Sequence, residues 1–302
     1  MTTPLTIVGS VALDTIETRA GKREEILGGA ATYIAFAAGV FTPVNLVAVV
    51  GDDFPKESAD LMADHGVDLQ GLKRVKGRTF RWAGRYAEDF STRETLGTEL
   101  GVFETFDPEI PAAYRTSGFA LLGNIHPALQ LKVLDALPKE TFVAADTMNL
   151  WIDTTPDALA EVIRRVNLLI INDEEAAMLT GELQVRVAAR KIIEGGLEFL
   201  IIKRGEHGAY LFTREAMFFA PALPLDEVVD PTGAGDSFAG GLMGHLAGRG
   251  EATLDAIKTG MVYGAAVASR AVEAFGADEF AKLKRAEVDE RVGALVNLVA
   301  LP

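Results

Sequence analysis

The sequence predicts an α/β fold: a doubly wound, mostly parallel sheet with helices on both faces and a small additional β-sheet. Short apolar runs alternate with helical patterns along most of the 302 residues, as in parallel sheets whose crossover connections are helices. The apolar runs are nearly continuous, which is typical of strands covered on both faces. Two polar segments interrupt the alternation and predict the small sheet.

The expected strands of the main sheet are short apolar runs, of which LTIVG and VNLVAVVG come first. They lie at 5–9, 44–51, 119–124, 141–146, 168–172 and 199–203. The stretches between them carry helical patterns at 31–41, 55–66, 127–137, 155–166 and 185–196. From Asp236 onward the pattern is almost wholly helical, and its many small residues let neighbouring helices approach closely.

The small sheet is expected from two segments that break the alternation. Residues 12–27 form a polar, β-like stretch, and residues 78–106 alternate aromatic and charged side chains around a turn at Glu88-Asp89, which is the pattern of a hairpin with one exposed face. Together they could project from a single domain that spans residues 1–302. The pattern alone leaves open whether this sheet is a lid over a site or an edge hairpin.

Composition excludes several classes of function. The net charge is −14 at pH 7, and so acidic a surface disfavours nucleic acids and anionic membranes, although one pocket can still be locally positive. The chain has no cysteine, which excludes disulfides, thiolate metal sites and cysteine nucleophiles. The N-terminus lacks the basic start and apolar core of a signal peptide, and no apolar run approaches the ~18 residues of a membrane span. We therefore expect a soluble cytoplasmic protein.

The segment DPTGAGDSFAGG (230–241) carries the strongest chemical signal. A glycine-rich turn that leads into a helix leaves backbone amides unpaired, and the helix dipole adds positive charge, so the site favours an anion such as phosphate. Asp236 nevertheless puts a carboxylate there. A carboxylate beside such amides can take a proton from a hydroxyl while the amides hold the phosphoryl group that the hydroxyl attacks. The structural alternative is that Asp236 is only a helix N-cap.

Other glycine-rich nucleotide motifs fit this segment less well. A Walker A loop needs a lysine after its last glycine, and none follows Gly235. A dinucleotide fingerprint needs G-x-G-x-x-G after the first strand, but after Gly233 and Gly235 the third glycine position holds Phe238. The first strand itself runs into Gly9-Ser10 without the motif. The sequence therefore argues against a nicotinamide-dependent dehydrogenase.

These motifs together resemble the ribokinase-like (PfkB) carbohydrate kinases. DPTGAGDSFAGG is similar to the C-terminal signature of that family, and the N-terminal half matches it with VGSVALD (8–14), GGAATYIAFAAG (28–39) and VVGDDF (49–54). NDEEA (172–176) resembles its N-x-x-E element, and KRGEHGAYLF (203–212) resembles its nucleotide-side strand pair. The resemblance covers nearly the whole chain and implies a doubly wound sheet with a small β lid. It also implies an ATP- and Mg²⁺-dependent kinase for a hydroxymethyl group of a sugar or nucleoside.

The resemblance also implies roles for individual residues. Asp236 takes the position of the catalytic base, and Asp14 that of the group that binds substrate hydroxyls. Of Lys203 and Arg204, which end a strand, we expect Arg204 to lie nearer to phosphate. Glu175 has an alternative role as a dipole partner at the start of a helix. The remaining implied positions are the anion hole at Gly233, Ala234 and Gly235, the sugar pocket at Gly28 and Gly29, the magnesium- and phosphate-linked element at Asn172 and Glu175, and the nucleotide side at Lys203, Gly205, Gly264 and Gly276.

One position departs from the family pattern. The G-G-x-x-x-N element has Tyr33 where family members often carry asparagine, so the sugar pocket loses an amide donor and acceptor, and ribose itself is in doubt. The tyrosine ring could instead stack on an apolar base or close the pocket. Trp82 of the lid could contribute in the same way. Asp146 and Asn149, which follow a strand, could meet the substrate or cap a loop.

We expect an ATP-dependent kinase that phosphorylates a hydroxymethyl group or ring hydroxyl of a sugar or sugar-like polyol. Two alternatives remain: a nucleoside kinase acting on inosine, guanosine, cytidine or adenosine, and a non-catalytic protein that binds nucleotides or sugars. The expected cofactors are ATP and Mg²⁺, with Glu175 as an indirect metal contact and a monovalent cation left open. Mg²⁺ should come with the nucleotide, since it prefers few carboxylates, waters and phosphates. No nucleic acid or membrane partner is expected, and a homodimer through the lid is left open.

Overall fold

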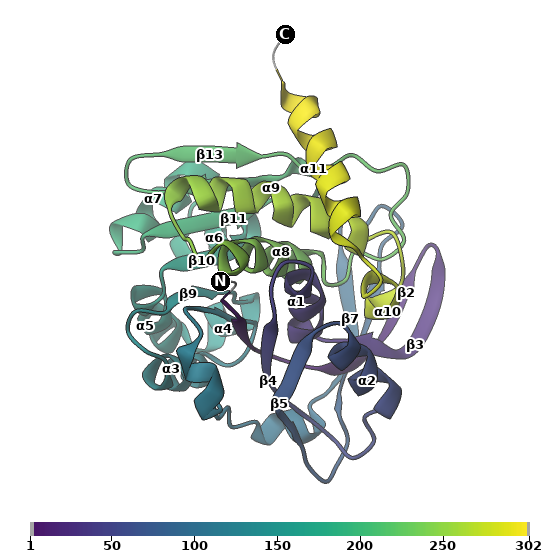
Figure 1. Ribbon diagram of the computed structural model, residues 1–302. Helices are drawn as coiled ribbons and strands as arrows, with labels where there is room; N and C mark the ends of the chain where they lie inside the picture. Colours follow the sequence, from purple (N-terminus) through teal and green to yellow (C-terminus); the bar gives the residue numbers. More distant parts are fainter. Residues whose placement is uncertain (1–2, 301–302) are drawn as a thin grey trace.

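The computed structural model describes residues 3–300, which form a nine-stranded sheet and a separate four-stranded sheet (Figure 1). The large sheet has the strand order β13-β12-β11-β10-β9-β8-β1-β4-β5. Its neighbouring pairs from β11 to β5 are parallel, and β12 and β13 extend it as antiparallel strands. Its strands are β1 (Leu5–Val8), β4 (Val44–Val50), β5 (Val67–Arg74), β8 (Phe119–Leu122), β9 (Phe142–Ala145), β10 (Leu168–Asn172), β11 (Phe199–Lys203), β12 (Ala209–Phe212) and β13 (Met217–Ala220).

Helices cover both faces of the large sheet, so the predicted doubly wound α/β fold is confirmed (Figure 1). Successive strand residues point to opposite faces: Ile7 belongs to one apolar core and Val8 to the other. The first core includes α1 (Ala30–Gly39), α2 (Lys56–Asp64), α8 (Ala234–Arg249), α9 (Leu254–Ala271), α10 (Gly276–Phe280) and α11 (Arg285–Val299). The second includes α3 (Pro127–Ala136), α5 (Pro156–Arg165), α6 (Asp173–Thr180) and α7 (Val185–Glu194), with α4 (Asn149–Thr154) just before α5. None of the helices within residues 3–300 combines the length and apolar character that crossing a membrane requires.

The sequence pattern located the central strands and missed both edge strands, β5 and β13. Each of the six predicted apolar runs contains a strand of the large sheet. β5 was not predicted, because only Val67 and Gly71 are buried among its eight residues while Asp68, Lys73 and Arg74 are exposed. A strand at the edge of a sheet is partly solvated and need not be an apolar run.

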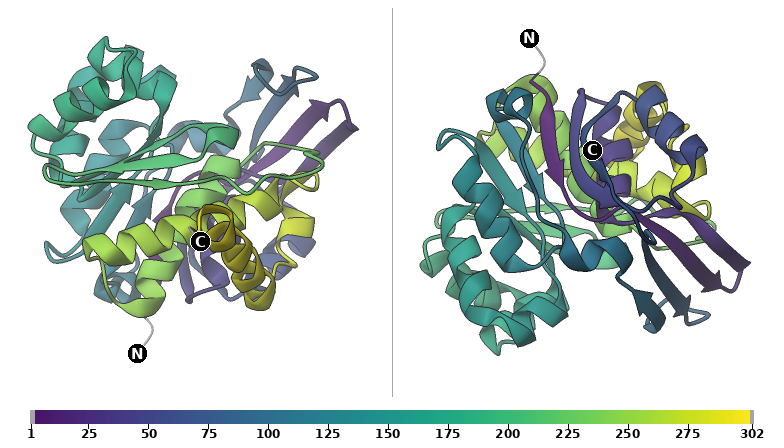
Figure 2. Two further views of the ribbon diagram at one scale, coloured as in Figure 1. Left: turned by 90° about the horizontal axis from the view of Figure 1, so that it is seen from above. Right: turned by 90° about the horizontal axis from the view of Figure 1, so that it is seen from below.

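The small sheet has the order β3-β2-β6-β7 and extends away from the large sheet (Figure 2). It is built from the two segments that the sequence pointed to, as β2 (Ala12–Thr18) and β3 (Gly21–Gly28), and β6 (Phe80–Tyr86) and β7 (Arg93–Glu99). The β6–β7 turn includes the predicted Glu88-Asp89 pair, whereas Gly101–Thr105 form a short 3₁₀ helix instead of strand. The parallel pairing of β2 with β6 joins the two segments into one sheet.

Glycines let α8 lie directly against its neighbours, and this close contact places the start of α8. A Cβ added at Gly240 would lie 2.5 Å from the carbonyl oxygen of Ile34 in α1. On the other side, a Cβ added at Gly264 of α9 would lie 2.6 Å from the carbonyl oxygen of Phe238. No side chain fits in either contact, so these positions fix how far α8 sits from α1 and α9.

Candidate active site

The N-terminus of α8 presents unpaired backbone amides. Gly233 caps the helix with a left-handed φ of 74° and no side-chain hydrogen bond. The amides of Gly233, Gly235 and Asp236 have no hydrogen-bond partner within residues 3–300. The amide of Ala234, in contrast, donates to the Pro231 carbonyl at 3.2 Å, so Ala234 does not supply a free amide to the expected anion hole. The free amides and the helix dipole still favour a negatively charged group here.

Tyr33 of α1 lies beneath this turn. Its buried ring would be 2.4 Å from a Cβ at Gly233, and it lies 6.4 Å from the ring of Phe280. A ring covered in this way cannot stack on a base, so the stacking alternative for Tyr33 is wrong, and the ring instead packs against the turn that starts α8. The Tyr33 hydroxyl has no hydrogen-bond partner within the described part of the chain. Burial and the charges of Asp230 and Asp14 raise its pKa, so it stays protonated.

We predict that Gly233→Ala destabilises the protein more than an equivalent substitution without the clash. A left-handed alanine costs about 1–2 kcal/mol, and overpacking against the Tyr33 ring adds about 1–3 kcal/mol. The matched control is Gly181→Ala, where φ is 72° and nothing lies within 4 Å of the added Cβ. Urea unfolding curves measure both free energies, and equal losses for the two variants would show that the contact with Tyr33 does not matter.

Lys203 brings a positive charge to the same place. It is the last residue of β11, and a Cβ at Gly235 would lie 2.9 Å from its Nζ. Arg204 instead turns to Asp173, with Nε 3.1 Å from a carboxylate oxygen. Lys203, and not Arg204 as expected, therefore lies beside the start of α8. The reason is that the strand ends at Lys203 and the chain turns at Arg204, which directs the next side chain away from the helix terminus.

Three carboxyl groups surround Lys203. The Lys203 Nζ lies 3.8 Å from Asp146 Oδ2. Burial acts to lower the pKa of Lys203, but the charges of Asp146, Glu175 and Asp236 outweigh burial and raise it, so the amine is charged. Burial, reinforced by Asp146, raises the pKa of Asp236 to about 7, against the opposing effect of Lys203. Asp236 is only partly covered from solvent, and a carboxyl group with this pKa can accept a proton at neutral pH.

Asn172 and Glu175 form the N-terminal cap of α6. The Asn172 side chain accepts from the Glu175 amide at 2.7 Å, and the Glu175 carboxylate accepts from the Asn172 amide at 2.8 Å. This capping box supports the structural role that the sequence left open for Glu175. Burial, then the charge of Asp146, raises the pKa of Glu175 to about 7. Within residues 3–300, no group of three or more histidine, aspartate or glutamate side chains is placed to hold a metal ion.

Asp14 lies in β2 against the turn that starts α1. Its Oδ2 accepts from the Gly29 amide at 3.3 Å, while its Oδ1 has no hydrogen-bond partner in the described chain. A Cβ at Gly28 would lie 2.0 Å from Asp14 Oδ2, which explains glycine at this position. Burial raises the pKa of Asp14 to about 7, the Gly29 amide opposes this, and the charges of Asp230 and Asp236 add to it. A buried oxygen without a partner can accept a hydrogen bond from a ligand hydroxyl.

The other predicted residues divide between the site and its surroundings. Asn149 is exposed at the start of α4, and its side chain makes no hydrogen bond within residues 3–300. Gly264 packs against Phe238 in the helix contact described above, which is a structural role. Gly276 has a φ of 65° and donates its amide to Asp230 Oδ2 at 3.2 Å, which ties its turn to the loop before α8. Gly205 begins a turn after β11 with open space around it.

The small sheet contacts the loop before α8 directly, and the contact involves Thr232 and Arg93, which the sequence analysis did not assign. The Thr232 hydroxyl donates to the Tyr86 hydroxyl of β6 at 3.0 Å. Arg93 pairs with Tyr86 across the hairpin, and its guanidinium lies 5.3 Å from the centre of the Trp82 ring. Arg93 also acts to lower the pKa of Asp236. The sequence offered one signal for Arg93: a hairpin centred on the Glu88-Asp89 turn places Arg93 opposite Tyr86.

Comparison with known families and curated proteins points to one group. The chain matches the model of the pfkB family carbohydrate kinases over residues 5–281. It is 35% identical over 253 residues to a cytidine kinase of Thermococcus kodakarensis, a match that covers 81% of this chain and 89% of that protein. It is 27% identical over 234 residues to a 2-dehydro-3-deoxygluconokinase of Thermoproteus tenax, covering 72% of this chain and 71% of the relative.

The fold is shared with solved structures. The structure of Arabidopsis thaliana ribokinase complexed with ribose and ATP superposes with a TM-score of 0.77 and 22% sequence identity. The match covers 97% of this chain and 99% of the ribokinase. The large sheet, its helices and the small sheet are therefore arranged as in that structure.

Proposed function

Because the chain belongs to the pfkB family of carbohydrate kinases, we propose that it phosphorylates a hydroxymethyl group of a neutral polyhydroxy acceptor, with ATP as the donor. Membership confirms the predicted family and class of enzyme, a sugar or nucleoside kinase that uses an alcohol group as acceptor. Within that class we propose a nucleoside as the first candidate acceptor and a free sugar as the second. The 35% identity to a cytidine kinase supports this order.

One arrangement carries the proposal: a proton acceptor beside unpaired amides and a buried cation. Asp236 has a pKa of about 7, raised by burial and then by Asp146. The amides of Gly233 and Gly235 are free, and the Lys203 amine lies within 2.9 Å of where a Gly235 side chain would begin. Phosphoryl transfer depends mainly on positioning and charge neutralisation, which these groups supply together.

The site fits the triphosphate of ATP in charge and in donors. The Gly233 and Gly235 amides and Lys203 would hold the phosphoryl oxygens. Mg²⁺ bound to the nucleotide would neutralise phosphate charge, and it needs few protein ligands. Asp146 and Glu175 lie beside Lys203 and could contact that ion through water.

The proposed step moves one proton and one phosphoryl group. Asp236 takes the proton from the acceptor hydroxyl as the oxygen of that hydroxyl bonds to the γ-phosphorus of ATP. The bond between that phosphorus and the bridging oxygen breaks, and ADP leaves with the electron pair. The free amides and Lys203 stabilise the charge on the transferred group, and the contact between Tyr86 and Thr232 holds the small sheet over the loop and limits access of water.

The acceptor pocket favours a neutral polyol over a sugar acid. Asp14 and Asp230 lie near one another, since the charge of Asp230 raises the pKa of Asp14, and both charges raise the pKa of the Tyr33 hydroxyl. Carboxylates accept hydroxyl hydrogen bonds but repel a second carboxylate. A ribose ring with adjacent hydroxyls would satisfy the unpartnered oxygens of Asp14 and Tyr33.

We predict that Asp14→Ala raises the KM for the acceptor by about 10- to 100-fold, the equivalent of one lost hydrogen bond to a charged group. The KM for ATP should change less than about twofold, because ATP does not contact Asp14 in this arrangement. The matched control is Asp89→Ala, which removes an exposed carboxylate from the β6–β7 turn. Steady-state kinetics with both substrates varied measures the effect, and equal changes in the two KM values would contradict the role of Asp14.

A coupled assay of ADP release over nucleosides, pentoses, hexoses, inositols and sugar acids tests the acceptor class. We expect the highest kcat/KM with a nucleoside and a lower value with free ribose. A preference for a sugar acid would contradict the argument from the carboxylates. ADP release with none of these acceptors would leave the non-catalytic alternative standing.

A further inference from the structure

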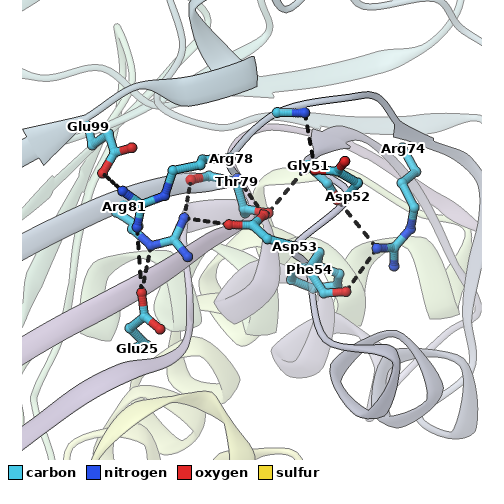
Figure 3. Close-up of polar contacts among 11 residues, drawn as sticks. Glu25, Gly51, Asp52, Asp53, Phe54, Arg74, Arg78, Thr79, Arg81 and Glu99 are labelled. Carbon is cyan, nitrogen blue, oxygen red and sulfur yellow. Dashed lines mark hydrogen bonds and ion pairs between the residues drawn. The ribbon is translucent and has the colours of Figure 1, made fainter.

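The loop that follows β4 is fastened to the base of the small sheet by Asp53 (Figure 3). Asp53 Oδ1 accepts hydrogen bonds from both the amide and the hydroxyl of Thr79 at 2.7 Å, and Asp53 Oδ2 lies 2.8 Å from a guanidinium nitrogen of Arg81. Thr79 is fully buried, and its hydroxyl also accepts from the Gly51 amide at 3.0 Å. The VVGDDF motif, which the proposed reaction does not use, therefore forms a polar joint between the two sheets.

Arg81 continues this joint across the small sheet. Its Nε donates to Glu25 Oε1 at 2.8 Å, so one guanidinium connects Asp53 to Glu25 of β3 (Figure 3). The Arg81 side chain is 16% exposed and that of Asp53 is 29% exposed, so their ion pair is partly shielded from water and salt, whereas Glu25 is 58% exposed. Arg81 thus connects β6, the loop after β4 and β3.

Glu25 holds an unusual backbone conformation. Its φ of 50° lies in the left-handed region, which residues other than glycine rarely adopt. It is part of a bulge in β3, because Asp14 pairs with Ile26 but Ile16 pairs with Arg23. Such a conformation persists only where surrounding contacts hold it, and the ion pair with Arg81, at 2.8 Å, is shorter than the one that Glu25 makes with Arg78, at 3.9 Å.

The bulge sits directly beside Asp14. The pairing of Asp14 with Ile26 turns its carboxylate toward Gly28 and Gly29. A shift of one residue in this pairing would move Gly28 and Gly29 away from the Asp14 carboxylate, so the Gly29 amide could no longer hold Asp14 Oδ2. The register at the bulge therefore decides whether the Gly29 amide keeps the Asp14 carboxylate directed into the acceptor pocket.

We propose that Arg81 is a positioning residue: held by Asp53, it stabilises the left-handed bulge at Glu25 and thereby the register that aims Asp14 into the pocket. This inference rests on the proposed role of Asp14 in binding the acceptor. Arg81 acts through the bulge and does not itself bind the acceptor. Its effect should appear in the acceptor KM and leave the nucleotide site unchanged.

Kinetics of Arg81→Met test this role. We expect the acceptor KM to rise about tenfold and the KM for ATP to change less than about twofold, since a small misplacement of a binding group has effects of this order. The control is Arg85→Met, which removes another arginine of β6 whose pairs, with Glu17 and Glu94, are exposed and do not reach the joint. Asp53→Asn should reproduce the effect and provides a second variant if Arg81→Met folds poorly. Equal changes for Arg85→Met and Arg81→Met would overturn the proposal.

A suppressor variant separates positioning from direct contact. Glycine adopts the left-handed conformation without strain, so Glu25→Gly should keep the bulge even without Arg81. We expect the double variant Arg81→Met/Glu25→Gly to recover an acceptor KM within about threefold of the wild type, as removal of backbone strain allows. If Arg81 bound the acceptor directly, the glycine would restore nothing, and that result would overturn the proposal.

Hydrogen exchange provides a readout that needs no acceptor. Amides of residues 22–27 should exchange about tenfold faster in Arg81→Met than in the wild type, because local opening becomes easier, and the double variant should return toward the wild-type rate. Unchanged exchange would overturn the proposal whatever the kinetics show. Faster exchange in a protein that phosphorylates no tested acceptor would instead count against the proposed function alone.

Discussion

Asp236→Asn is expected to lower kcat by about 10²- to 10⁴-fold, which is the contribution of a general base. The asparagine keeps the size of the side chain and the start of α8 but cannot accept the proton of the acceptor hydroxyl. ADP and ATP should still bind, because the amides of Gly233 and Gly235 and the Lys203 amine remain. Steady-state kinetics gives kcat, and calorimetric titration with ADP gives the nucleotide affinity.

The pH dependence of the wild type follows from the same carboxyl group. Burial, reinforced by Asp146, raises the pKa of Asp236 to about 7. Because the base works only when deprotonated, kcat/KM should fall about tenfold per pH unit below that pKa and level off above it. Asp236→Asn should lose the part of this acidic limb that Asp236 contributes, and the part that remains reports Asp14 and Glu175, whose pKa values are also raised to about 7.

The control for Asp236→Asn is Asp255→Asn, which changes an exposed aspartate in the first turn of another helix, α9. This variant should keep the wild-type kcat. Thermal unfolding shows separately whether Asp236→Asn still folds. The Asp236 carboxyl group, with its raised pKa, stabilises the folded state relative to the unfolded state only while it is protonated, and this stabilisation is lost as the pH rises toward 7. At pH 8 the asparagine should therefore not lower the midpoint of thermal unfolding. Normal turnover by Asp236→Asn would remove Asp236 as the base.

Lys203→Met has the second largest expected effect. It removes the buried cation that lies near Asp146, Glu175 and Asp236. We expect kcat to fall about 10²- to 10³-fold, as when an electrostatic donor to the transition state is lost, and the KM for ATP to rise about tenfold or more. Kinetics at several ATP concentrations separates the two effects.

The same substitution should move the pH profile in a defined direction. The positive charge of Lys203 opposes burial and Asp146 and so lowers the pKa of Asp236. Without it, that pKa rises, and the acidic limb of kcat/KM shifts to higher pH. Asp146→Asn should shift the limb to lower pH, because it removes the negative charge that raises the pKa. A limb that stays in place in both variants would show that it does not report Asp236.

The control for Lys203→Met is Lys191→Met on α7, which changes an exposed lysine paired with Glu182. It should alter neither kinetics nor the pH profile. Loss of a buried cation can also destabilise the fold by about 3–5 kcal/mol, so thermal unfolding should be followed in parallel. Lys203→Arg, which keeps the charge but is larger next to Gly235, should retain folding better than Lys203→Met and bind ATP more weakly than the wild type.

The chain itself determined the layered fold and the position of Asp236 at the start of a helix. Central strands are buried on both faces, so their continuous apolar runs identified β1, β4, β8, β9, β10 and β11. The sequence also predicted the loop from Asp230 to Asp236 as the start of a helix with free amides. A glycine turn that starts a helix is a local feature, and its free amides depend on adjacent residues only.

Tertiary structure alone decided which distant side chains meet that loop. Lys203 rather than Arg204 faces Gly235, the Tyr33 ring packs against Gly233, and Arg93 arrives from the small sheet. Each of these contacts joins segments that are far apart in the sequence, and its geometry depends on where a strand ends or how two sheets pack. The pKa of Asp236 is of the same kind, since burial and the charges of Asp146 and Lys203 act through space and leave no periodic trace in the order of residues.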